Sequence, residues 1–166
     1  MIEKNIRVGI VMGSDSDLPI IEKVVGVLKE MDIPYEVHVD SAHRTSDTAK
    51  KWAMSARDNG IGVIIAAAGM AAHLAGAIAA NTTLPVIGIP CKSNVLDGMD
   101  ALLSTVMMPS GIPVATVAID GGKNAALLAA EILAVEDAEL ASKLEKRRKD
   151  ESDTVLKKDE TILERL

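Results

Sequence analysis

The sequence predicts an α/β fold, a three-layer sandwich in which helices cover both faces of a parallel β-sheet. Short runs of β-branched and other apolar residues recur along the chain, and longer segments with helical spacing of apolar residues separate them. The runs are almost continuously apolar rather than alternating, which is typical of parallel strands buried on both faces. Strands that alternate with helices imply right-handed crossovers.

Five segments share the continuous apolar pattern and are expected to be strands. They are residues 6–12, 35–39, 63–67, 85–89 and 114–119. Five strands in a chain of 166 residues suit a flavodoxin-like sheet with the strand order 2-1-3-4-5.

Helices are predicted between these strands. Apolar spacing predicts one over residues 18–31, which Asp32-Ile33-Pro34 ends, and one over 46–59, which Thr45 or Ser46 would cap and Gly60 would end. Residues 124–135 are apolar nearly all round except for Glu131, so we expect a helix that is buried on every side and meets another subunit.

The chain is expected to form one catalytic domain over residues 1–148. Residues 149–166, the end of a charged segment that starts at 136, are predicted to form an extended C-terminal helical arm, or a tail, packing on a neighbouring subunit.

Composition excludes several function classes. The net charge of −6 supplies no basic field for nucleic acid, and an aromatic content of 1 % leaves no stacking platform for single strands. One cysteine and three scattered histidines make a poor metal set. The charged N-terminal residues show no signal peptide, so we expect a cytoplasmic protein.

Residues 61–80 are uncharged and long enough to span a bilayer. However, they consist largely of Ala and Gly, which insert poorly, and they include His73. We therefore interpret them as a buried strand followed by an Ala-rich helix, with no membrane contact.

Three loops carry the unusual polar residues: 13–17 after the first strand, 41–45 after the second and 69–73 after the third. In the 2-1-3 order these loops are neighbours at the carboxyl edge of the sheet, where ligands of such folds bind.

The first loop offers a glycine, the hydroxyls of Ser14 and Ser16, and the free N–H groups of a helix start, as a phosphate requires. Alternatively, Ser14, Ser16 and Asp17 only cap the helix; Asp17 could cap and still face ribose hydroxyls. Neither a three-glycine dinucleotide fingerprint nor a P-loop is present, because Val117 stands where the first P-loop glycine belongs.

The second loop pairs a titratable group with a phosphate clamp. Arg44 can bind phosphate bidentately, and His43 can donate and accept a proton near neutral pH. Alternatively, Arg44 is a surface residue and His43 hydrogen-bonds backbone. His38 is interpreted as structural, and His73 as either a ligand-binding or a core residue. Gly69 would let backbone approach a ligand closely.

Six motifs, in order over residues 6–148, resemble the N5-carboxyaminoimidazole ribonucleotide mutase family. They are Gly-Ser-Asp-Ser-Asp at 13–17, Ser-Ala-His-Arg-Thr at 41–45, Ala-Gly-Met-Ala-Ala-His-Leu at 68–74, Leu-Pro-Val-Ile-Gly at 84–88, Met-Pro-Ser-Gly-Ile-Pro-Val-Ala-Thr at 108–116 and Asn-Ala-Ala-Leu-Leu-Ala-Ala at 124–130.

The resemblance implies an isomerase of de novo purine synthesis that moves a carboxylate from the exocyclic nitrogen of an imidazole ribonucleotide to ring carbon C4. It implies no metal or organic cofactor and a homo-octamer. It makes His43 the proton shuttle. The other implied roles are phosphate binding by Ser14, Arg44, Ser16 and Ser41, ribose binding by Asp17, and enclosure of carbon dioxide by Ala68, Gly69, Met70, Ala71 and His73.

The chain departs from the family pattern at a few positions. Many members have Gly at Met70, Pro at Ala75, Ser at Ala101 and Gln at Met107, and Thr45-Ser46 replaces Thr-Pro. Met70 and Ala75 put rate and loop rigidity in doubt more than reaction type.

Three alternative functions stay open. A related carboxylase uses free carbon dioxide, but that branch usually has Lys after the histidine, so Arg44 favours the mutase. A phospho-receiver domain would use Asp15 and Asp17, yet Ala66-Ala67-Ala68-Gly69 lacks its phosphoacceptor. A third possibility, motivated by Met70 and Ala75, is a protein that binds the nucleotide without turnover.

Overall fold

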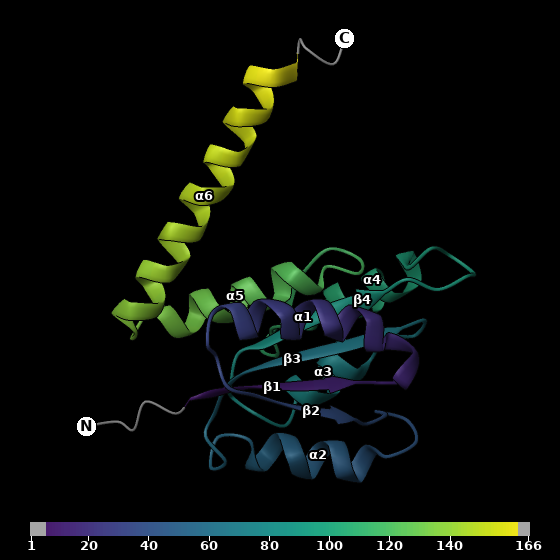
Figure 1. Ribbon diagram of the computed structural model, residues 1–166. Coiled ribbons are helices and arrows are strands. Elements are labelled where there is room, and N and C mark those ends of the chain that lie inside the picture. Colours follow the sequence, from purple (N-terminus) through teal and green to yellow (C-terminus); the bar gives the residue numbers. More distant parts are fainter. Residues whose placement is uncertain (1–5, 163–166) are drawn as a thin grey trace.

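The computed structural model describes residues 6–162, in which five strands form one parallel sheet with helices on both faces (Figure 1). The strand order is β2-β1-β3-β4-β5, which confirms the predicted order. The strands are β1 (Arg7–Met12), β2 (Tyr35–Val39), β3 (Ile61–Gly69), β4 (Val86–Cys91) and β5 (Ala115–Thr116). All neighbouring pairs are parallel.

The helices alternate with these strands, as the pattern predicts. They are the 3-10 helix η1 (Asp15–Asp17), α1 (Leu18–Glu30), α2 (Ser46–Ser55), α3 (Leu74–Ala79), α4 (Met99–Val106), α5 (Gly122–Ala134) and α6 (Ala138–Ile162). The uncharged stretch that could have spanned a bilayer forms β3 and α3 instead. Across residues 6–162, we find no helix with the length and apolar character that crossing a membrane requires.

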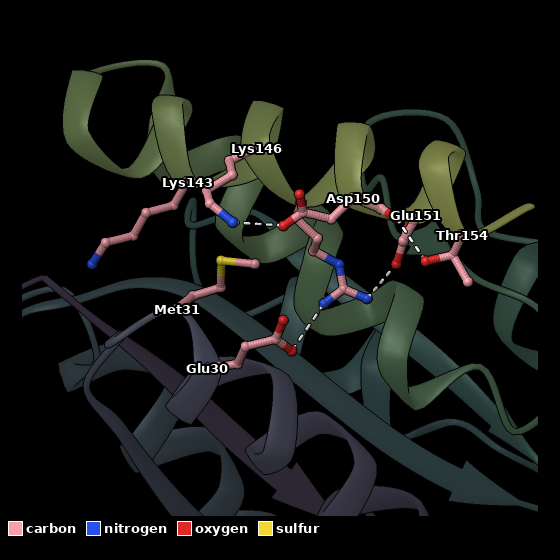
Figure 2. A pocket seen from close by; sticks show the side chains of 8 residues that line it. Glu30, Met31, Lys143, Lys146, Asp150, Glu151 and Thr154 are labelled. Carbon is pink, nitrogen blue, oxygen red and sulfur yellow. Dashed lines mark hydrogen bonds and ion pairs between the residues drawn. The ribbon is translucent and has the colours of Figure 1, made fainter. Parts of the chain in front are cut away.

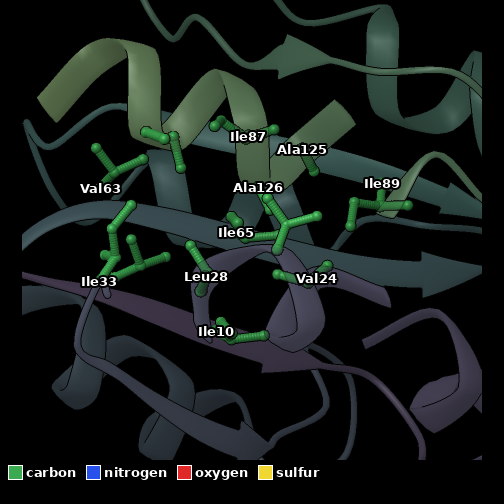
Figure 3. Close-up of a cluster of buried hydrophobic side chains, with 14 of the residues drawn as sticks. Ile10, Val24, Leu28, Ile33, Val63, Ile65, Ile87, Ile89, Ala125 and Ala126 are labelled. Carbon is green, nitrogen blue, oxygen red and sulfur yellow. The ribbon is translucent and has the colours of Figure 1, made fainter. Parts of the chain in front are cut away.

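Two apolar clusters, one on each face of the sheet, make up the core. The cluster in Figure 3 joins Ile10 and Ile65 of the strands to Leu28 of α1 and Ala126 of α5. The opposite cluster joins alternate strand residues such as Val11 to α2 and α3. Successive residues of β1 therefore enter different clusters, which explains why the strand is continuously apolar.

Close approach between β1 and α2 depends on Gly9. A Cβ there would lie 2.9 Å from both the Trp52 ring of α2 and the Ile61 side chain. Trp52 donates from its indole nitrogen to the carboxylate of Glu36 over 2.9 Å, and its ring centroid lies 5.4 Å from that of His38. His38 itself lies 3.1 Å from the same Glu36 carboxylate, consistent with a structural role.

Several boundaries differ from the prediction. α2 ends at Ser55 rather than at residue 59, and turns carry the chain to Gly60, which has a φ of 77°. β5 is reduced to two paired residues from the expected 114–119. One reason is that Pro90, in the adjoining strand, has no N–H to donate to a longer ladder. The helix α4 was not predicted from the sequence.

The apolar helix α5 lies against α1 and the sheet through a stripe of alanines that are fully buried. They are Ala125, Ala126, Ala129 and Ala130. Its leucines are only partly buried, so the expected burial on every side is not reached within this chain. Contact of its outer side with another subunit stays a prediction.

The first half of α6 packs on the domain, whereas its second half projects away from it (Figure 1). Leu140 and Leu144 are buried, and the Arg147 guanidinium bridges Glu30 of α1 at 3.0 Å and Glu151 at 2.7 Å. Figure 2 shows the groove of about 400 Å³ where α6 meets the end of α1. The helix is continuous through residues 148 and 149; residues 163–166 lie outside the described part of the chain.

Candidate active site

Backbone hydrogen bonds hold the first two loops to the carboxyl edge of the sheet. Gly13 donates its N–H to the carbonyl of Ala67 in β3 over 3.0 Å, and Asp40 donates to the carbonyl of Met12 in β1 over 2.9 Å. The loops after β1, β2 and β3 therefore start at one edge, as the strand order predicts.

The first loop is organised around Ser14, which caps η1. Its hydroxyl oxygen accepts from the backbone N–H of Ser16 over 3.3 Å and from the Ser16 hydroxyl over 2.9 Å. Asp17, in contrast, makes no side-chain hydrogen bond to the start of α1. Ser14 therefore caps the short η1, while the carboxylate of Asp17 does not cap α1.

Asp17 is 9 % exposed and lies near Cys91 at the end of β4, whose thiol donates to the carbonyl of Ile89 over 3.6 Å. Burial raises the pKa of Asp17, although the polar groups of Cys91 and the Ser14 backbone oppose the shift, and the charges of Asp120 and Asp15 add to it. Burial beside these carboxylates also raises the pKa of Cys91, so it remains a thiol. This proximity was not predicted from the sequence.

The second loop is a tight turn held by Ser41. Its hydroxyl oxygen accepts from the backbone N–H groups of His43, over 3.3 Å, and Arg44, over 3.2 Å. Thr45 closes the turn by donating its hydroxyl to the buried Asp40 and accepting from the N–H of Ser41 over 2.8 Å. The side chains of His43 and Arg44 stay exposed, and neither hydrogen-bonds to any group within residues 6–162.

The third loop brings His73 to His43. Their ring centroids lie 6.4 Å apart and the planes are inclined by 17°. His73 stands at the start of α3 with its side chain exposed, so it is not a core residue. β3 ends with the half-buried Ala68 and Gly69, and the exposed Met70 and Ala71 follow before His73.

The third loop also adjoins the first. Cys91, which lies near Asp17, pairs with Gly69 in the ladder between β3 and β4. A Cβ on Gly69 would lie 3.3 Å from the Cys91 carbonyl oxygen, so this position favours glycine. The third loop thus adjoins both other loops, the second through His43 and the first through Cys91.

The three loops carry hydroxyls, an arginine, two imidazoles and a buried carboxyl at the carboxyl edge of the sheet, beside Ala and Gly residues. Such groups can bind an anion, orient a hydroxylated ligand and transfer a proton. As for metals, nowhere in residues 6–162 do three His, Cys, Asp or Glu side chains group so that they could hold an ion.

Comparison with known proteins yields consistent matches. The family model described as "AIR carboxylase" matches residues 7–154. The N5-carboxyaminoimidazole ribonucleotide mutase of Pyrococcus abyssi is 56 % identical over 87 % of this chain and 83 % of its own length. The phosphoribosylaminoimidazole carboxylase of Saccharomyces cerevisiae is 50 % identical over 94 % of this chain but only 26 % of its own length.

The fold has a solved counterpart as well. The crystal structure of Treponema denticola PurE superposes with a TM-score of 0.85 at 31 % identity, covering 93 % of this chain and 96 % of that one.

Proposed function

The chain belongs to the AIR carboxylase family, and on this premise we propose that it is an N5-carboxyaminoimidazole ribonucleotide mutase, an isomerase of de novo purine synthesis. The observation that carries the proposal is the meeting of His43 and His73 beside a loop of small residues. The mutases of Pyrococcus abyssi and Bacillus subtilis, 56 % and 52 % identical, support it.

The phosphate and ribose would anchor the substrate. Arg44 extends from the Ser41 turn with no protein partner in residues 6–162, so its guanidinium is free to clamp a phosphate, helped by Ser14, Ser16 and Ser41. Asp17 would accept hydrogen bonds from the ribose hydroxyls.

His43 would act as the proton shuttle. The bond between the exocyclic nitrogen and the carboxylate breaks, and the nitrogen keeps the electron pair and takes a proton from the His43 imidazolium. C4 then attacks the freed carbon dioxide, and His43 recovers the proton that C4 loses. Substrate and product are isomers, so the sequence balances with no cofactor, and one group serves both half-reactions.

Carbon dioxide has no charge to hold it, so it must be confined until C4 attacks. Ala68, Gly69, Met70 and Ala71 supply apolar walls without polar side chains, and His73 borders them. A dry pocket of this kind also protects the intermediate from water.

We further propose that the chain works in the cytoplasm as a homo-oligomer, an octamer by the family resemblance. Large apolar side chains lie exposed along α4, among them Met99, Leu103 and Val106, which are 52 %, 53 % and 46 % exposed. Together with the outer side of α5 and the projecting half of α6, they form the surface that neighbouring subunits would cover.

The rival function is that of a carboxylase, which adds free carbon dioxide to aminoimidazole ribonucleotide. The experiment is to incubate the protein separately with each substrate and to follow the 4-carboxy product. We expect turnover of N5-carboxyaminoimidazole ribonucleotide. Turnover only of aminoimidazole ribonucleotide with carbon dioxide would identify the carboxylase, and binding without turnover would identify a non-catalytic nucleotide binder.

A further inference from the structure

Met70 adopts a backbone conformation that its residue type disfavours. Its φ is 56°, in the left-handed region, where a Cβ crowds the backbone. The other non-glycine residues between 6 and 162 with positive φ are Asp32, Asp97 and Asp120. Aspartate tolerates this region because its short polar side chain bonds locally, whereas methionine has no such means.

Each of these aspartates also makes a polar contact. Asp32 pairs with Lys143 at 2.9 Å, Asp97 pairs with Lys92 at 3.1 Å, and Asp120 accepts from the backbone N–H of Lys92 over 2.8 Å. The side chain of Met70 makes no hydrogen bond within residues 6–162, and it is 61 % exposed. Within residues 6–162, no contact of this side chain offsets the cost of its conformation.

The loop around Met70 is nevertheless held firmly. Ala72 donates its N–H to the carbonyl of Met70, and His73 donates to that of Ala71, each over 2.8 Å. These bonds keep the left-handed turn and place Met70 between small neighbours, three residues before the imidazole that meets His43. It is the one large apolar side chain in the loop 69–73, whose other residues are Gly, Ala and His73.

We propose that Met70 is a specificity-determining residue, whose side chain covers the bound imidazole ring and keeps released carbon dioxide beside C4. This inference rests on the proposed mutase function. A methionine suits the task because it is apolar, unbranched and flexible, and because its sulfur contacts aromatic rings favourably. The strained conformation is then retained for the ligand and not for the fold.

The test is retention of a labelled carboxylate. N5-carboxyaminoimidazole ribonucleotide carrying 13C in its carboxylate is converted by wild type, Met70→Gly and Met70→Leu in excess unlabelled bicarbonate. The 13C content of the product and the yield of decarboxylated aminoimidazole ribonucleotide are measured, with enzyme-free decarboxylation subtracted. Met54→Ala serves as the control, because Met54 is equally exposed, at 62 %, but lies on α2, lining a groove at the opposite edge of the sheet.

We expect wild type, Met54→Ala and Met70→Leu to retain most of the label. Met70→Gly should lose several-fold more of it to solvent, while its melting temperature stays equal or rises, because glycine adopts the left-handed turn freely. If Met70→Gly converts substrate with wild-type retention, the inference is overturned while the mutase function stands. If wild type converts no substrate, the proposed function itself fails.

If Met70 instead contacts a neighbouring subunit, its replacement should change the size of the assembly. The mass in solution, measured by light scattering, should be the same for Met70→Gly and wild type. A smaller assembly with wild-type label retention per active subunit would overturn the inference and assign Met70 to an interface instead.

Discussion

The first loop of the site and the two loops beside it differ in how completely they are built before any ligand binds. In the first loop, Asp17 is buried near Cys91 and Ser14 caps a helix. In the second and third, His43, Arg44 and Met70 are all exposed, and only their backbones are fixed. The contrast indicates that the first loop is preformed, whereas the exposed side chains of the other two await a partner; in the proposed function these are the ribose end and the reacting end.

The sharpest test of the contrast is His43→Asn. If the exposed loop carries the chemistry and not the anchoring, kcat should fall by about 10²–10⁴-fold, the usual contribution of a proton-transfer group. The Kd of the product, measured by calorimetry, should change little. His38→Asn is the control, because His38 pairs with Glu36 on β2. Wild-type turnover of His43→Asn would refute the shuttle.

A second test is Arg44→Ala. Losing a charge-assisted contact to phosphate costs about 3 kcal/mol, so KM should rise roughly 100-fold with a smaller change in kcat. Arg57→Ala is the control, because Arg57 bonds to Thr83 at the opposite edge of the sheet. An unchanged KM for Arg44→Ala would mean that the phosphate lies elsewhere.

The substitution Asp17→Asn tests the preformed first loop. One lost charged hydrogen bond to ribose costs about 1.5 kcal/mol, or roughly tenfold in KM. Because burial raises the pKa of Asp17, wild-type KM should rise as pH falls through a range above that of an ordinary aspartate. Steady-state kinetics across pH should show this acid limb in wild type and not in Asp17→Asn.

Asp17 should also make the free energy of unfolding depend on pH. With its pKa raised on folding, the native state holds the proton over a range where the unfolded chain has lost it. Its contribution to the free energy of unfolding therefore falls as pH rises through that range, and Asp17→Asn should remove this dependence. Denaturant titrations that show identical pH dependence for both proteins would contradict the burial argument.

The smallest effect on the fold is expected from deleting residues 150–166. The described side chains from Asp150 onward are exposed, so losing them should change the free energy of unfolding of the domain by no more than about 0.5 kcal/mol. Light scattering should show whether the assembly shrinks. A large loss of stability with unchanged mass would contradict the role of the segment as an arm for a neighbour.

Strand order and the meeting of the loops were predictable from the sequence because continuous apolar runs identify parallel strands, and their order places the loops together. The short α4 was not predicted. The end of α2 was placed too late, because the turns that follow it continue the helical sequence pattern without helical hydrogen bonds. The proximity of Asp17 to Cys91 involves residues that only the sheet brings together. The left-handed Met70 was not foreseen either, because its residue type gives no sign of that conformation.

One consequence of the packing at Gly9 is optical. Trp52 is the chain's single tryptophan, and there is no phenylalanine and one tyrosine. It lies on the helix that directly follows the His43 loop, with its indole bound to Glu36 and its ring beside His38. Its fluorescence therefore reports on this one corner of the molecule, so that ordering of the loop by a nucleotide, or protonation of His38, can be followed in the unmodified protein.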